Sequence, residues 1–145
     1  MVVAATVRGM RAEGTFTVAS FIPAEITPPR VEVSTAVAVG IATMVKAYAG
    51  KVTGRSATLF TSAFDPATGI GTYVAMESFE GSLGGVSGAF NYVHAASTLG
   101  DDRRDEHFAI VPSSGVGDLA GIHGAGGMAI DDDGTHRVWF DYEID

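Results

Sequence analysis

The sequence predicts an all-β protein, a closed antiparallel up-and-down β-barrel of about eight strands. Two observations predict this fold class. Short segments alternate apolar and polar side chains with a period of two residues, as strands with one covered face do. Turns rich in glycine or proline separate these segments by short connections, and no segment has the polar face of a surface helix. About eight strands enclose enough room for side chains or one small ligand.

The chain begins its regular structure with a strand and a proline-rich loop. Gly14 to Phe21 (GTFTVASF) alternates strictly, which predicts a strand. Ile22 to Arg30 holds three prolines and is predicted to be a loop, because proline cannot donate to the interior of a ladder. Val31 to Tyr48 is dominated by Val, Ala, Thr and Ile. It predicts two strands or one strand bent at Gly40, with a helix over 36–48 as the less favoured alternative.

The remaining elements follow from turn residues and alternation. Asp65–Gly69 (DPATG) and Asp131–Gly134 (DDDG) have the composition of turns. Residues 97–105 are charged and are expected to be solvated, with Asp101–Asp105 as a hairpin tip, and Gly50 and Gly54 mark an earlier turn. Strands are predicted at four further segments: Ser56–Phe64, Glu106–Pro112, Leu119–Ile122 and Thr135–Ile144.

The most informative segment is a hairpin over Thr72–Ala95. Two alternating runs flank Gly84 and Gly85, and paired glycines admit the positive φ that a tight turn needs. A turn centred between these glycines puts three cross-strand pairs on one face of the hairpin, because side chains alternate along strands. The pairs are Glu77 with Tyr92, Ala75 with His94, and Phe79 with Phe90.

Glu77, Tyr92 and His94 on that face are the candidate catalytic residues. A carboxylate among aromatic side chains is costly to bury, and desolvation is expected to raise the pKa of Glu77 toward neutrality, where it can shuttle protons. Tyr92 would then hydrogen-bond a carbonyl or enolate oxygen. The alternative is a buried polar triad that only fixes the hairpin.

Aromatic residues recur along the predicted strands and are the candidate ligand-binding residues of a barrel interior. An ordinary filled core is the alternative for this set. The four histidines lie on separate runs, so no metal site is predicted, and no cofactor motif is present. The candidate ligand-binding residues are Phe16, Phe60, Phe64, Tyr73, Phe79, Phe90, Phe108, Phe140 and Tyr142.

Composition limits the class of protein and its partners. The 145 residues predict a single domain over 1–145, with the barrel in 13–145. The net charge of −8 makes nucleic acid and anionic membranes poor partners, and the absence of cysteine excludes disulfides. Residues 1–5 lack the basic start of a signal peptide, and no apolar run has the length of a membrane helix. We therefore expect a cytoplasmic protein.

Three segments resemble a known bacterial family. GTFTVASF at 14–21, SFEGSLGGVSGAF at 78–90 and VPSSGVGDLAGIHGAG at 111–126 are similar to the motifs of the family called domain of unknown function 3224. The resemblance implies a β-barrel similar to allene oxide cyclase and other calycin-like proteins, and Glu77 and His94 fall where the family has its Glu and His. Phe21, Val86 and His123 depart from the family pattern, which fits a member specialised for its own apolar substrate.

These observations lead to a functional expectation. The leading hypothesis is a cofactor-independent cyclase or isomerase that binds a hydrophobic, polyketide- or lipid-like small molecule in the barrel lumen. A non-catalytic, lipocalin-like carrier and a structural subunit with a filled barrel are the alternatives. We expect residues 22–40 to cover one mouth of the barrel. Small uncharged residues on the predicted outer face favour a homodimer or homotrimer.

Overall fold

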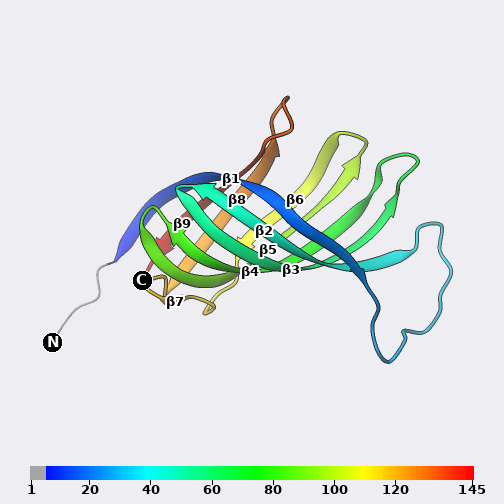
Figure 1. The fold of residues 1–145 in the computed structure, drawn as a ribbon, viewed down its shortest axis with the longest axis horizontal. Coiled ribbons are helices and arrows are strands. Elements are labelled where there is room, and N and C mark those ends of the chain that lie inside the picture. Colours follow the sequence, from blue (N-terminus) through cyan, green and yellow to red (C-terminus); the bar gives the residue numbers. More distant parts are fainter. Residues whose placement is uncertain (1–5) are drawn as a thin grey trace.

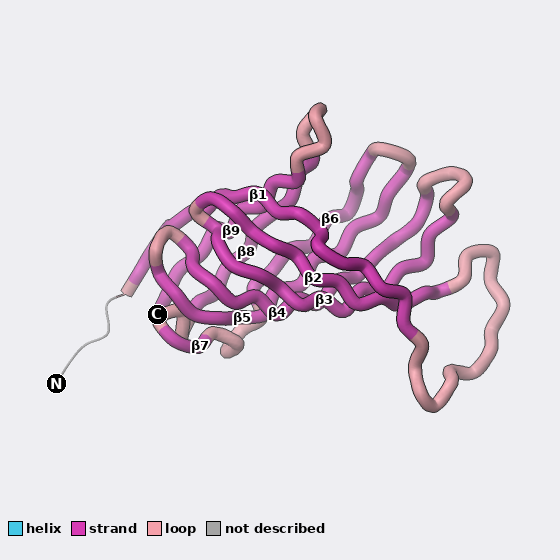
Figure 2. The backbone as a smooth tube through the Cα atoms, in the orientation of Figure 1, coloured by secondary structure: helices cyan, strands magenta, loops and turns pink. Residues whose placement is uncertain are grey.

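A computed structural model describes residues 6–145; the N-terminal segment considered above for a signal peptide lies outside the described residues. These residues form an antiparallel sheet of nine strands without a helix (Figures 1 and 2). The strands are β1 (Val7–Ala24), β2 (Val39–Gly50), β3 (Val52–Asp65), β4 (Ile70–Leu83), β5 (Val86–Leu99), β6 (Asp102–Ile110), β7 (Val116–Gly117), β8 (Ile122–Ile130) and β9 (His136–Ile144).

The hydrogen bonding of the sheet closes into a ring, which gives a barrel-like architecture. Each strand from β1 to β5 pairs with the next, β6 pairs with β5 and β8, and β9 pairs with both β8 and β1. The two-residue strand β7 lies beside β5. The prediction of an all-β antiparallel fold is therefore confirmed, and within residues 6–145 no helix is available to cross a membrane.

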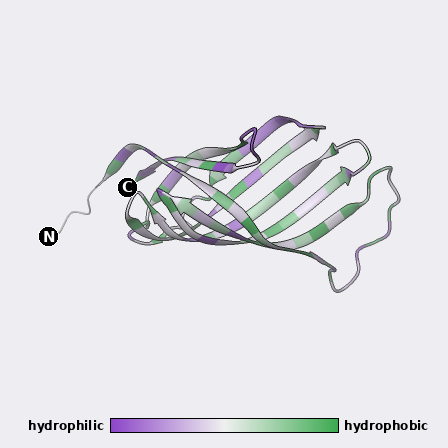
Figure 3. Ribbon diagram, turned by 45° about the horizontal axis from the view of Figure 1, so that its top comes forward, coloured by the Kyte–Doolittle hydropathy of each residue, from purple (hydrophilic) through white to green (hydrophobic). Residues whose placement is uncertain are grey.

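Hydropathy alternates along the strands, as Figure 3 shows, because one face of the sheet turns inward and the other outward. On β4 and β9 the inward residues include Phe79, Phe140 and Tyr142, all of which are buried. The register of the central hairpin is confirmed: Glu77 pairs with Tyr92, Ala75 with His94, and Phe79 with Phe90. The DDDG turn is confirmed too, by a hydrogen bond from the Gly134 amide to the Asp131 carbonyl.

Strand β1 runs past the predicted loop boundary at Ile22. Pro23 pairs with Ala42 of β2. On the other side, the pairing of β1 with β9 ends at Phe16 and His136. Beyond Phe16 the second edge of β1 is unpaired, and a proline without an N–H is tolerated at such an edge. The prediction that the strand ends before Ile22 is therefore wrong.

Two other predicted boundaries are also wrong. Residues 31–38 are not a strand although they are rich in valine, because they extend into solvent with no partner strand. The charged segment 97–105 is largely solvated, as predicted, and forms the tip of a hairpin in which β5 continues to Leu99 and β6 begins at Asp102. The start of β6 pairs only with β5, because the single residue pair between β6 and β8 is Ala109 with Ala125. The charged side chains at the start of β6 therefore reach water. Residues 119–121 form a turn, and the strand starts at Ile122.

Gly54 does not mark a turn but lies inside β3, opposite Gly81 of β4. Both have positive φ, 140° and 153°. A Cβ on Gly81 would lie 1.9 Å from the Thr53 carbonyl oxygen, and one on Gly54 would lie 2.1 Å from the Glu80 carbonyl oxygen. The backbones of β3 and β4 approach so closely here that only glycine fits on either strand.

The two ends of the sheet differ. The end that carries the turns at Gly50 and Gly84, which we call the filled end, holds a continuous aromatic and aliphatic core. Phe140 sits at its centre, with its ring centroid 5.1 to 6.3 Å from those of four other aromatic side chains: Phe79, Phe90, Tyr92 and Phe108. The opposite end, which we call the open end, carries the turns at Asp65–Gly69 and Asp131–Gly134 and the loop between β1 and β2 (Figure 1).

The outer face of β2, β3 and β4 carries exposed apolar side chains. Leu59 pairs with Met76, and both are exposed, as are Val45 and Val74. The expectation of a homodimer or homotrimer stays a prediction.

Candidate functional site

A buried ion pair lies in the interior between the two ends. Lys46 comes from β2 and Glu77 from β4, and the Lys46 Nζ is 2.9 Å from the Glu77 Oε1. Glu77 is 0% exposed and Lys46 is 5% exposed. The ammonium also lies 4.9 Å from the centroid of the Phe16 ring. Each charge compensates the other, which offsets part of the cost of removing both from water.

Hydroxyl groups complete the surroundings of the Glu77 carboxylate. Thr58 donates to Oε1 at 2.8 Å, and Ser56 donates to the same oxygen at 3.2 Å. The Tyr48 hydroxyl lies 3.4 Å from Oε1 and 2.6 Å from the Tyr92 hydroxyl. Burial raises the pKa of Tyr48 and of Tyr92 well above the ordinary tyrosine value, so both stay protonated. The second carboxylate oxygen, Oε2, is buried without a partner.

Glu77 therefore does not lie among aromatic side chains alone, because a cation and two hydroxyl donors also surround it. The ammonium of Lys46 lies beside its Oε1, and the hydroxyl of Thr58 donates to the same oxygen. Tyr92 is linked to this group through Tyr48. The sequence reasoning missed Lys46, although a signal existed: Lys46 has the same parity as Tyr48, and it is the sole charged residue between Val39 and Gly50.

His94 faces the interior but is turned away from Glu77. Its Nε2 lies 2.9 Å from Oε2 of Glu106 on β6. Arg103 donates to the same Glu106 oxygen at 3.1 Å and to the carbonyl of Met128 on β8 at 2.9 Å. Burial lowers the pKa of His94 below its ordinary value, while Glu106 opposes this shift. Burial therefore favours the neutral form of the imidazole.

An apolar cavity of about 290 Å³ opens near these groups at the open end. Phe60 and Tyr73 stack at its wall, with ring centroids 5.7 Å apart and planes inclined by 20°. Tyr73 packs with its ring nearly perpendicular to that of His94, with centroids 5.4 Å apart, so the histidine contacts a residue of the cavity wall. The lining residues are Phe21, Phe60, Ser62, Phe64, Thr72, Tyr73 and Thr98.

The structure divides the predicted ligand-binding aromatics into two groups. Phe60, Phe64 and Tyr73 line the cavity. The other six pack against one another and against aliphatic side chains in the core of the filled end: Phe16, Phe79, Phe90, Phe108, Phe140 and Tyr142.

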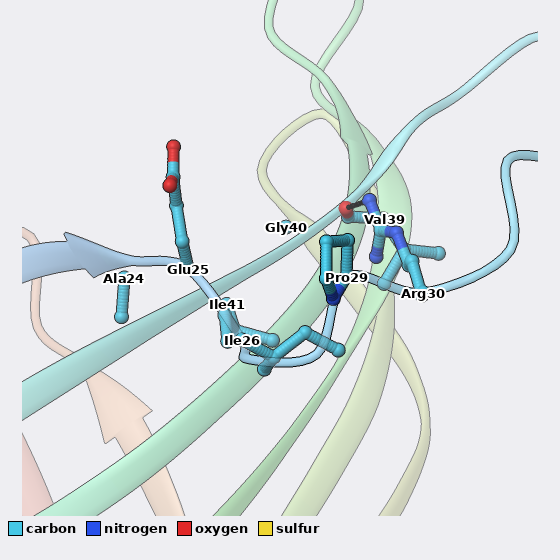
Figure 4. A pocket seen from close by; sticks show the side chains of 8 residues that line it. All are labelled: Ala24, Glu25, Ile26, Pro29, Arg30, Val39, Gly40 and Ile41. Atoms are coloured by element: carbon cyan, nitrogen blue, oxygen red, sulfur yellow. Dashed lines mark hydrogen bonds between the residues drawn. The ribbon is translucent and has the colours of Figure 1, made fainter.

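A second hollow, of about 280 Å³, lies at the base of the loop between β1 and β2. Figure 4 shows Ile26, Pro29 and Ile41 around it and Glu25 pointing away, while Arg30 donates to the carbonyl of Val39. The loop extends beyond the strands in Figure 1, and the lining of the apolar cavity includes no residue between 22 and 40. Covering of the mouth by this segment stays a prediction.

Metal-ligating side chains do not gather within the described part of the chain. No group of three or more His, Cys, Asp or Glu residues has the geometry to hold a metal ion there. The polar groups buried in the interior include an ion pair, hydroxyl groups and the imidazole of His94.

Comparison with known proteins gives the family of the chain. No curated protein matches the sequence. A solved structure from Shewanella oneidensis, described as a protein with unknown function from the DUF3224 family, has 28% sequence identity and a TM-score of 0.78. The match covers 93% of this chain and 97% of that chain. The model of the family described as protein of unknown function (DUF3224) matches residues 12–142, so this chain belongs to the DUF3224 family.

Proposed function

We propose that this protein binds a hydrophobic small molecule in the cavity of the open end. The observation that carries the proposal is the lining: four aromatic side chains, three phenylalanines and Tyr73, surround the cavity, and Ser62 and two threonines are its other lining residues. A cavity of about 290 Å³ suits a molecule, or part of one, with a flat or chain-like apolar body. A polyketide or lipid fragment meets this description, and the segment 22–40 is proposed to close over it.

Filling the cavity tests this proposal directly. Ser62 lines the cavity from β3, and Ser62→Trp places an indole inside it. The neutral probe N-phenyl-1-naphthylamine should bind the wild-type protein with a rise in fluorescence, and Ser62→Trp should weaken its binding roughly tenfold or more, since the loss of a few contacts costs more than 1.4 kcal/mol.

Thr61→Trp is the matched control. Thr61 is the neighbouring residue on β3 but points outward and is exposed, so the same substitution leaves the cavity open. Equal binding of the probe by wild type and both variants would place the binding elsewhere and contradict the proposal.

A second candidate function adds chemistry to binding. Lys46, Glu77 and His94 face the interior of the closed sheet, and ionisable groups at such positions are found in enzymes that move protons. We propose, as this alternative, a cofactor-independent cyclase or isomerase with the allene-oxide-cyclase-like subtype of barrel. Such a protein acts mainly by folding a flexible substrate into a shaped cavity, and orientation alone lowers a barrier by up to roughly 7–11 kcal/mol.

Catalysis and carriage are separated by product analysis. A panel of polyene epoxides and unsaturated keto acids is incubated with protein and analysed by mass spectrometry and chromatography for isomers of unchanged mass. If the protein is an isomerase or cyclase, at least one compound of the panel should both displace N-phenyl-1-naphthylamine from the protein and be converted into a new isomer. Displacement without any new isomer supports the carrier.

A further inference from the structure

His94 packs against Tyr73, one of the residues that line the cavity. On the inner face of the sheet, Ala75 of β4 pairs with His94 on one side and with Phe60 on the other. Phe60 lines the cavity. In the row of paired residues Phe60, Ala75 and His94, Ala75 is the residue between Phe60 and the imidazole. Tyr73, two residues from Ala75 on the same strand, contacts both aromatic rings.

The tautomer of His94 follows from its partners. Arg103 pairs with Glu106, so the Glu106 side chain is a carboxylate and can only accept hydrogen bonds. The His94 nitrogen that contacts it, Nε2, must therefore carry the hydrogen. In the neutral imidazole Nδ1 is then the basic nitrogen, and among the described residues it has no hydrogen-bonding partner.

Glu106 also connects His94 with solvent. The His94 side chain is 4% exposed, whereas Glu106 is 31% exposed and Arg103 is 27% exposed. Arg103 is fixed at its other end by the carbonyl of Met128, so it bridges β6 and β8 where these strands share a single residue pair. The carboxylate is thus held in place beside a buried imidazole while remaining able to exchange protons with water.

We propose that His94 is the proton-transfer group that serves the cavity, with Glu106 and Arg103 as its positioning residues. The proposal rests on the proposed function, because it requires a ligand in that cavity. The ligand class it implies is an apolar molecule with a weakly acidic C–H or O–H at the end that meets Tyr73 and His94.

The charged groups around His94 decide its pH dependence. Glu106 on β6 favours the imidazolium, while Arg103 on β6 and Lys46 on β2 disfavour it, and burial disfavours it most. Tyr73 on β4 stays protonated because burial raises its pKa. Burial thus lowers the pKa of His94, so activity that needs the neutral base rises with pH through this lowered pKa and is level above it.

A small aromatic probe tests the base without knowledge of the natural ligand. 5-Nitro-1,2-benzisoxazole is a flat apolar molecule. A base removes its C3 proton, the C–H electron pair completes a nitrile, the N–O bond breaks, and 2-cyano-4-nitrophenolate leaves. No oxidant or second reactant takes part, and absorbance follows the phenolate. Nδ1 of His94 is the expected proton acceptor in the wild-type protein.

The variants give a graded expectation. His94→Gln should lower kcat/KM for the probe roughly 100-fold. Glu106→Ala, at a partly exposed side chain, should lower it roughly tenfold, and Glu106→Gln, which keeps an acceptor oxygen, should restore most of the loss. Ser62→Trp should abolish the reaction by occupying the cavity. Glu80→Gln is the control, since Glu80 is exposed and pairs with Arg55.

Nitrogen NMR of histidine-labelled protein supplies a readout that needs no activity. Wild type and Glu106→Gln should show His94 protonated at Nε2 alone, whereas Glu106→Ala should show a mixture of tautomers. An unchanged His94 tautomer in Glu106→Ala, or an unchanged reaction rate in His94→Gln, would overturn the inference. If the wild-type protein does not bind N-phenyl-1-naphthylamine, the proposed function itself is overturned. This binding is measured separately on the same samples.

Discussion

Replacing Lys46 by methionine should lower the free energy of unfolding by about 3–5 kcal/mol. Methionine matches the volume of lysine but leaves the Glu77 carboxylate without a counter-charge at a position that is 0% exposed. The hydroxyl of Thr58 still donates, yet a neutral donor does not replace the ammonium 2.9 Å away. Urea denaturation followed by tryptophan fluorescence measures the loss.

The double variant Lys46→Met, Glu77→Gln supplies the control. With both charges removed, its stability should lie within about 1 kcal/mol of wild type or above it, because buried ion pairs contribute little relative to neutral side chains of similar size. Additive losses in the double variant would show that packing and not charge governs this site.

Phe140→Ala should lower the free energy of unfolding by about 3–5 kcal/mol, because it empties the centre of the aromatic cluster. Phe140 is 0% exposed and contacts four other aromatic side chains. The probe should still bind to any folded fraction, since the cavity is formed by other residues.

Phe60→Ala is the matched comparison at the open end. Phe60 lines the cavity and is only partly buried, so its loss should cost about 1–2 kcal/mol of stability and weaken N-phenyl-1-naphthylamine binding instead. Similar stability losses for Phe140→Ala and Phe60→Ala would contradict the division of the molecule into a filled end and an open end.

The sequence predicted those parts of the fold whose determinants are local. Gly84 and Gly85 fix the turn, and alternation on either side then sets the register of Glu77 with Tyr92, which the structure confirms. Strand ends were predicted poorly because they depend on neighbours far along the chain. Pro23 is tolerated in β1 only because β9 ends at a point that leaves the edge free.

The candidate site shows the same limit. Glu77 and His94 were recognised as inward-facing from their shared hairpin, but their partners come from other strands. Lys46 reaches Glu77 across β3, and Glu106 meets His94 after a bulge that shifts the register of β5 with β6 between Ala95 and Ser97. The spacing of residues within one segment does not predict either of these contacts. The sequence therefore groups Glu77 with His94, whereas in the structure Glu77 pairs with Lys46 and His94 pairs with Glu106.

The short reach of the β8–β9 hairpin has a consequence for the shape of the ligand. β9 begins at His136, opposite Phe16, so Phe21 lines the cavity from the part of β1 that pairs with β2 but not with β9. If the proposed ligand is longer than the cavity, its apolar head would lie inside, and its tail would leave on the side of β1 that has no neighbouring strand.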